Sequence, residues 1–246
     1  MGRAAFVGIS LALLGSLTSA GGAWSATPVS ECGQFFHGKG VLTGDLDCSA
    51  YDGHAVVMTS GKLDLAGFTI FQGHGYAVGC FGNCRVLGPG AIVGSVNGFE
   101  AVRAESVSVR KVTITGANGA VNATNNAQTG RAAIRDSMIT GNYFGVVADR
   151  LVKLVRSTVT DNRTDGVATG NAQCVPGKVF AIDSTITGNG TDPACGVDFT
   201  CADVATCQRT PILRRSTCGT SYVLESGIPG QSLGVCALDD PAPRLP

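Results

Sequence analysis

The stretch Ala181-Ile-Asp-Ser-Thr-Ile-Thr-Gly-Asn189 decides the fold, because the chain repeats it with small changes. Close copies are Ala133-Ile-Arg-Asp-Ser-Met-Ile-Thr-Gly-Asn142 and Leu154-Val-Arg-Ser-Thr-Val-Thr-Asp-Asn162, and a looser copy is Val109-Arg-Lys-Val-Thr-Ile-Thr-Gly-Ala117. Each copy alternates apolar and polar residues and ends in a turn signal, which is typical of a β-strand. The chain is therefore a series of similar β units.

We call the apolar residue before each turn the measuring residue, because its spacing gives the length of the repeat. It recurs as Ile70, Ile92, Ile114, Ile139, Val159 and Ile186, at intervals of 22, 22, 25, 20 and 27 residues, and Cys218 extends the series after a longer insertion. A period in this range indicates stacked supersecondary units rather than one globular core. The 35 glycines interrupt the chain too often for helices of ordinary length.

Each period has room for three short strands and three turns. After Ile92, for example, a second strand is expected around Phe99–Val102, and a third, Val107–Val109, leads into the next unit. This arrangement predicts an all-β fold, a single-stranded parallel β-helix of about seven coils. We expect it to be right-handed, as crossovers between parallel strands generally are.

Two polar columns follow from the register. Two residues before each measuring residue stands an inward-facing position, filled by Val112, Ser137, Ser157, Ser184 and Ser216. Three residues after it come Asn142, Asn162 and Asn189. Asparagine tolerates the left-handed backbone of a turn, and its amide can bond the next amide in the stack, so we expect an internal asparagine ladder.

The N-terminus has the pattern of a secretory signal peptide. Arg3 precedes an apolar stretch, Ala4–Leu17, which is too short to span a bilayer, and small residues follow. We therefore expect a signal peptide over 1–26, an N-terminal cap over 27–52, β-helix repeats over 53–222, and a C-terminal cap and tail over 223–246. The protein should be secreted or periplasmic, without a transmembrane anchor.

Charge is balanced along the chain. Once Arg3 is removed, 17 basic residues face 18 acidic ones. Such balance argues against long-range attraction to nucleic acid or to an anionic membrane, although a local charged patch is compatible with it.

Ten cysteines in an exported chain indicate disulfides. The disulfide candidates are Cys32, Cys48, Cys80, Cys84, Cys174, Cys195, Cys201, Cys207, Cys218 and Cys236. Spacing favours the local pairs Cys32–Cys48 and Cys80–Cys84, whereas the last six leave fifteen connectivities open. The alternative, zinc at Cys195, Cys201 and Cys207, lacks the close spacing of structural zinc sites.

Several segments resemble secreted right-handed parallel β-helix proteins of the pectate-lyase-like superfamily. They are Cys32-Gly33, Leu42-Thr-Gly-Asp-Leu-Asp-Cys48, Leu63-Asp-Leu-Ala-Gly-Phe-Thr-Ile70 and Gly88-Pro-Gly-Ala-Ile-Val-Gly94, and with the repeats the resemblance runs from about Cys32 to Tyr222. The resemblance implies the β-helix fold. Its members include polysaccharide lyases, hydrolases and epimerases, phage tailspikes and adhesins, so it implies an extracellular polysaccharide or cell-surface glycan as partner.

Outward charges form the main candidate site. Three residues before the measuring residue stand Lys111, Asp136, Arg156, Asp183 and Arg215, and one step earlier Arg110, Arg135 and Arg214. Stacking sets them along one ridge, about 5 Å apart. A lyase needs a cation to neutralise a uronate and a base to remove a proton, so Lys111, Arg135, Asp136 and Arg156 are the catalytic candidates, and Arg110, Tyr143 and Asp183 the substrate-binding candidates. The alternative is a surface ladder of ion pairs, which the alternating signs favour.

Other motifs give weaker indications. Gln72-Gly-His-Gly75 is similar to the Gly-His-Gly of pectin hydrolases but lacks an aspartate pair before it, so we expect a turn. No metal ligands and no cofactor are predicted, although lyases of this superfamily often hold Ca²⁺, which a lyase activity here would also imply.

Two functional hypotheses remain. In the first, a secreted β-helix binds or processes an acidic polysaccharide along the ridge. In the second, the chain is a non-catalytic structural or adhesion rod at the cell surface or in the envelope.

Overall fold

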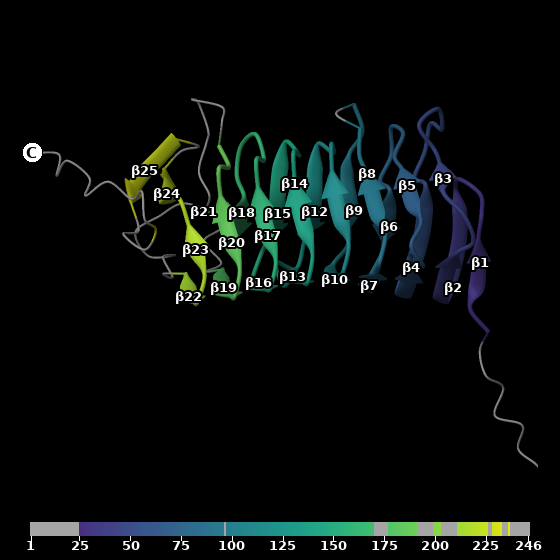
Figure 1. The fold of residues 1–246 in the computed structure, drawn as a ribbon, viewed down its shortest axis with the longest axis horizontal. Helices are drawn as coiled ribbons and strands as arrows, with labels where there is room; N and C mark the ends of the chain where they lie inside the picture. The colour runs from purple at the N-terminus through teal and green to yellow at the C-terminus, as the bar shows by residue number, and fades with distance from the viewer. Residues whose placement is uncertain are drawn as a thin grey trace, which may run out of the picture.

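In the computed structural model, parallel strands stack into a β-solenoid of about six turns, close to the seven expected (Figure 1). The structure describes residues 25–95, 97–169, 177–190, 199–202, 211–225, 228–232 and 236, and for 199–202, 222–225 and 228–232 it describes the backbone alone. Every element of the described residues is a β-strand. Residues 1–24, and with them most of the expected signal peptide, lie outside the described residues.

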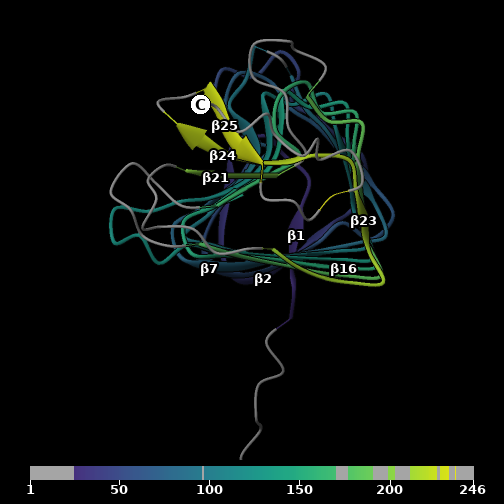
Figure 2. The same cartoon turned by 90° about the vertical axis from the view of Figure 1, so that its left-hand side faces the viewer.

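The strands of the solenoid lie on three faces (Figure 2), and the two longest, Gln34–Leu42 and Val56–Asp64, run from the third face into the first. The strands of the first face are β2 (Gln34–Leu42), β4 (Val56–Asp64), β7 (Asn83–Leu87), β10 (Ser106–Arg110), β13 (Arg131–Arg135), β16 (Leu151–Val155), β19 (Lys178–Ile182) and β22 (Ile212–Arg214). The second face is β3 (Leu46–Asp47), β5 (Thr69–Phe71), β8 (Ala91–Val93), β11 (Thr113–Thr115), β14 (Met138–Thr140), β17 (Thr158–Thr160), β20 (Thr185–Thr187) and β23 (Thr217–Cys218). The third face is β6 (Val78–Cys80), β9 (Glu100–Arg103), β12 (Gly119–Ala123), β15 (Phe144–Ala148), β18 (Val167–Thr169), β21 (Phe199–Ala202) and β24 (Ser221–Glu225).

The measuring residues of the sequence repeat form one column of the core. On the second face, Ile70, Ile92, Ile114, Ile139, Val159, Ile186 and Cys218 pair in register from strand to strand. The six aliphatic members are completely buried. The repeat therefore marks a vertical stack in which each apolar side chain packs on its equivalents above and below.

The ends of the solenoid differ from its middle. At the start, β1 (Thr27–Val29) pairs with β2, and β2 and β3 pair in parallel with β4 and β5, so the segment expected as a cap already follows the register of the repeats. At the other end, β24 pairs antiparallel with β25 (Ile228–Ser232), which interrupts the parallel stacking (Figure 2).

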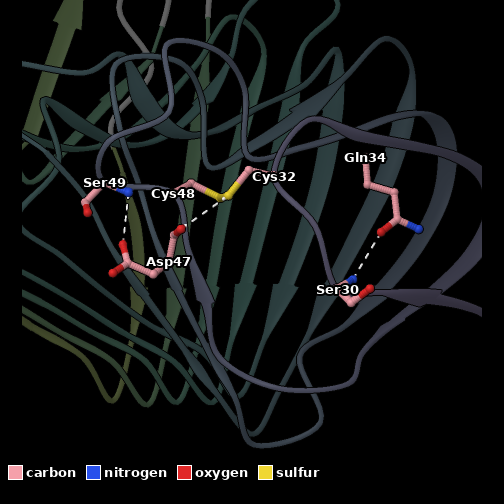
Figure 3. Close-up of a disulfide and its surroundings, with 6 residues drawn as sticks. All are labelled: Ser30, Cys32, Gln34, Asp47, Cys48 and Ser49. Atoms are coloured by element: carbon pink, nitrogen blue, oxygen red, sulfur yellow. Dashed lines mark hydrogen bonds between the residues drawn. A yellow bond between two sulfur atoms is a disulfide. The ribbon is translucent and has the colours of Figure 1, made fainter.

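Three disulfides join described cysteines. Cys32–Cys48 fastens the first turn, where the Cys48 side chain is buried (Figure 3), and Cys80–Cys84 links β6 to β7. These are the two local pairs expected from the spacing. Cys218–Cys236 closes the C-terminal end and reduces the fifteen connectivities of the last six cysteines to three. Cys174, Cys195 and Cys207 lie outside the described residues, as does the side chain of Cys201.

The asparagine ladder is present at the corner between the second and third faces. The Oδ1 of Asn162 accepts hydrogen bonds from the backbone N–H and the Nδ2 of Asn142, at 3.1 and 3.0 Å, and the Oδ1 of Asn189 accepts the same pair from Asn162, at 3.1 and 2.7 Å. Each side chain thus satisfies backbone groups that the turn removes from strand pairing.

Candidate functional site

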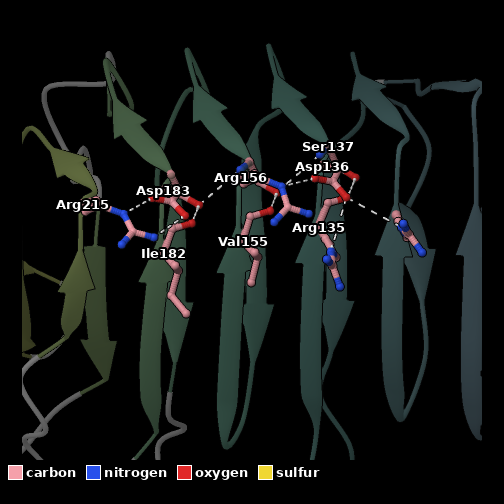
Figure 4. Close-up of polar contacts among 11 residues, drawn as sticks. Arg135, Asp136, Ser137, Val155, Arg156, Ile182, Asp183 and Arg215 are labelled. Atoms are coloured by element: carbon pink, nitrogen blue, oxygen red, sulfur yellow. Dashed lines mark hydrogen bonds and ion pairs between the residues drawn. The ribbon is translucent and has the colours of Figure 1, made fainter.

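The expected charged ridge exists, at the corner between the first and second faces. There one residue per turn adopts the left-handed backbone conformation, with φ of 58° at Lys111, 51° at Asp136, 47° at Arg156, 50° at Asp183 and 49° at Arg215. The bend points the side chain out of the corner and turns the next residue inward. Stacked bends therefore align these side chains along the rod (Figure 4).

The inward residue after the bend is held by a second ladder. The backbone N–H of Ser157 donates to the Oγ of Ser184 at 3.2 Å, and that of Ser184 donates to the Oγ of Ser216 at 3.0 Å. The Oγ of Ser184 in turn donates to the carbonyl of Ile182 at 2.8 Å. The sequence predicts small, stacked side chains there, and the structure shows in addition that their hydroxyls bond the backbone of the adjacent turn and of their own.

Asp136 is the centre of the ion pairs on the ridge (Figure 4). Arg156 donates to it from Nε at 2.6 Å, and the Nε atoms of Arg135 and Arg110 lie 3.4 and 3.7 Å from its carboxylate. Asp183 lies one turn beyond Arg156 and accepts a hydrogen bond from the Nη2 of Arg215 in the following turn, at 2.9 Å. The ridge is thus a network in which each aspartate binds arginines of neighbouring turns.

Hydrogen bonding fixes the protonation of both aspartates. The Arg156 guanidinium holds the pKa of Asp136 below its ordinary value, and the Arg215 guanidinium does the same for the pKa of Asp183. A carboxylate that is already ionised and engaged by arginine is a weak acceptor for a substrate proton near neutral pH. Among the catalytic candidates, Lys111 alone makes no ion pair within the described residues. Asp136 of the next turn lines the same shallow pocket as Lys111, but its carboxylate is engaged by arginines.

The ridge does not fit the calcium ion that a lyase would bring. Asp136 and Asp183 are separated by the turn that carries Arg156, hence by two strand spacings or about 10 Å. A calcium site needs several oxygen ligands around one point. Within the described residues, no three His, Cys, Asp or Glu side chains converge in that way.

Tyr143 lies apart from the ridge, at the corner between the second and third faces. Its ring packs edge-on against Phe144 at 5.1 Å, and the guanidinium carbon of Arg163 lies 5.6 Å from its centroid. Tyr143 is therefore separated from Arg110 and Asp183 by the width of the second face, and the structure does not bring these three substrate-binding candidates together.

The first face carries a concentration of positive charge that the sequence analysis missed. Its strands contain nine basic side chains and a single acidic one, Asp64, which lies 3.5 Å from Lys62. The nine are Lys39, Lys62, Arg85, Arg110, Arg131, Arg135, Lys153, Lys178 and Arg214. By contrast, the second-face strands contain no basic residue, and Arg103 of the third face is paired with Glu100. We call the outer surface of the first face the basic face.

Strand register explains why these charges stand together. Lys39, Lys62 and Arg85 pair in consecutive strands, and the same row continues through Ser108 and Ala133 to Lys153. Buried residues alternate with them along each strand, so the cationic side chains all point outward. Within the described residues, Lys39, Arg85, Arg131, Lys153, Lys178 and Arg214 form no ion pair.

A shallow groove of about 700 Å³ lies in the middle of the basic face. Its floor consists of small residues, chiefly Ser108 and Ala133, and its walls include Arg85, Arg131 and Lys153. Since Arg85 and Lys153 are three strand spacings apart, the groove spans about 14 Å along the rod. It can hold an extended anionic ligand in contact with several cations.

A pattern in the sequence could have revealed the basic face. Its central row stands two residues before Arg110 and Arg135, at positions of the same outward parity. The balanced total charge of the chain conceals this segregation. Comparisons of the chain with protein-family models, with curated proteins and with solved structures found no match. Function has to be derived from the geometry of the basic face itself.

Proposed function

We propose that the protein binds an acidic polysaccharide along the basic face, without cleaving it. The observation that carries this proposal is the segregation of nine outward cations on one face of a chain whose total charge is balanced. Unpaired cations in a row are costly to keep together unless an anionic partner screens them. A rigid β-solenoid holds them in fixed positions before the ligand arrives, which lowers the entropic cost of binding.

The spacing suits a charged polymer. In the central row, Lys39, Lys62 and Arg85 stand about 4.8 Å apart in neighbouring turns, and Lys153 follows three strand spacings beyond Arg85, so an extended chain meets several cations along the row. Arg85 and Arg131 can each bind a carboxylate through two parallel N–H donors, and Lys153 adds a compact charge. The small residues Ser108 and Ala133 leave room for a sugar ring between them.

Location and resemblance favour polysaccharide over nucleic acid. Three disulfides fit an extracellular or periplasmic protein, where acidic glycans are the abundant polyanions. The resemblance to the pectate-lyase-like superfamily supports the same ligand class. Among the residues that the structure describes, no helix is long and apolar enough to cross a membrane.

The ion pairs of the ridge favour binding over cleavage. Asp136 and Asp183 are held as arginine-bound carboxylates, and the groove wall offers arginine and lysine but no carboxylate. A structural rod, the second hypothesis, does not require the cations to lie on one face.

The test compares retention of the purified protein on immobilised polygalacturonate with retention on the same polymer after methyl esterification, which removes the charge and keeps the backbone. We expect retention on the charged form only, with release by added salt. Arg131→Gln should weaken binding severalfold, whereas the charge-matched Arg103→Gln on the third face should not.

Three results would contradict the proposal. Equal behaviour of Arg131→Gln and Arg103→Gln would show that the basic face is not the contact surface. Equally tight binding of double-stranded DNA and polygalacturonate would refute the ligand class. Release of unsaturated uronates from the polymer would show that the protein is an enzyme.

A further inference from the structure

The basic face becomes more apolar toward its C-terminal end. A second pocket of about 330 Å³ lies there, lined by Leu151, Lys153, Phe180, Ile182, Ile212 and Arg214. Four of these six side chains are apolar although they stand on the outer surface of the solenoid. Of the four, Ile212 is the most exposed, at 45 %.

Phe180 lies at the centre of the pocket. In the strand register it stands between Lys153 of β16 and Ile212 of β22, each about one strand spacing away. Ile182 follows it along β19 with the same outward parity, and Arg214 pairs beside Ile182. An aromatic ring and two isoleucines therefore form an apolar surface, and Lys153 and Arg214 place positive charge on opposite sides of it.

We propose that this pocket binds an aromatic group that carries a negative charge. An aryl ring fits the apolar surface because it can stack on Phe180 and cover Ile212. Its acid group then reaches Lys153 or Arg214, neither of which forms an ion pair within the described residues. Neutral aromatic molecules lack the second interaction and small acids lack the first, so the pocket selects ligands that combine both.

The pocket and the groove of the proposed function meet at Leu151 and Lys153, which line both. A free aryl acid and an aryl acid attached to an acidic polysaccharide would present the same chemistry to the pocket. The proposal does not depend on polysaccharide binding, since its probe contains no sugar.

The experiment titrates the full chain with 2-naphthoate, and separately with neutral 2-naphthamide and with acetate, by isothermal calorimetry. We expect saturable binding of naphthoate and at least about fivefold weaker binding of the other two. Ile212→Ser should weaken naphthoate binding about fivefold or more, while Met138→Ser, at a second-face residue that is 46 % exposed, should leave it within about twofold. Arg214→Gln should reduce the preference for naphthoate over naphthamide.

The same titration can overturn the proposal. Equal affinities for naphthoate and naphthamide, equal effects of Ile212→Ser and Met138→Ser, or no saturable binding of naphthoate would each do so. Repeating the titration with polygalacturonate bound distinguishes the two sources: competition or unchanged affinity assigns the pocket to an aryl acid that is free in solution, and tighter binding assigns it to a group attached to the polymer.

Discussion

Replacing Asn162 with alanine should destabilise the fold more than any other single truncation on the asparagine ladder. Asn162 is fully buried and is the middle of three ladder residues. Its Oδ1 accepts two hydrogen bonds from Asn142, and its Nδ2 donates to the Oδ1 of Asn189 at 2.7 Å and to the carbonyl of Ile139 at 3.4 Å. Alanine removes all four.

The size of the destabilisation depends on which partners of Asn162 lose their only hydrogen bond. The Nδ2 of Asn142 keeps the carbonyls of Ile114 and Thr140, but within the described residues the backbone N–H of Asn142 has no second acceptor. One buried unsatisfied N–H costs about 1 to 3 kcal/mol. Together with the lost bonds of Nδ2 and the cavity that alanine leaves, the free energy of unfolding should fall by about 3 to 5 kcal/mol.

Urea unfolding followed by far-ultraviolet circular dichroism measures this change, with Asn97→Ala as the control. Asn97 is exposed, and only its backbone N–H bonds to Ser95, so its truncation should cost less than about 0.5 kcal/mol. If the two variants differ by less than about 1 kcal/mol, the ladder does not support the turn as described.

Three further predictions concern single side chains. Ser184→Ala removes the acceptor for the backbone N–H of Ser157 and should lower the free energy of unfolding by about 1 to 3 kcal/mol in the same urea assay. Asp161→Gly should raise it by about 0.5 to 1 kcal/mol, because Asp161 has φ of 55° where the equivalent Gly188 has 68°. Burial raises the pKa of Asp165 to about 7, and its Oδ1 has no hydrogen-bond partner among the residues that the structure describes. The folded protein then binds more protons than the unfolded chain between about pH 4 and 7, so the free energy of unfolding should fall as the pH rises through this range, by up to roughly 4 kcal/mol. Asp165→Asn should remove this pH dependence.

The architecture could be predicted from the sequence alone because each unit repeats the same pattern of strands and turns. A buried Ile or Val stacks on its equivalent in the next turn, so the spacing from Ile70 to Ile186 already contains the strand register of the second face. Asn142, Asn162 and Asn189 were predictable for a similar reason, since a buried turn needs side chains that bond its backbone. The segment 27–52 was harder to place, because its strands β2 and β3 follow the register without the repeated motif.

The function was less accessible because it depends on positions that the repeat leaves variable. Whether Arg85, Arg131 and Lys153 stand together depends on the number of residues between units, which varies from 20 to 27. The ion pairs of Asp136 also required coordinates, because three arginines from different turns reach one carboxylate. Charge balance along a sequence says nothing about how a solenoid distributes its charges among its faces.

The most direct test of the basic face as a binding surface is a titration of the ¹⁵N-labelled protein with oligogalacturonate, followed by amide chemical shifts. Binding in the groove predicts the largest changes at Ser106, Ser108 and Ala133, which line its floor, and none at Thr113 or Thr140 of the second face. Shifts confined to the second or third face, or no shifts at saturating oligogalacturonate, would contradict the central claim that the segregated cations bind an acidic polysaccharide.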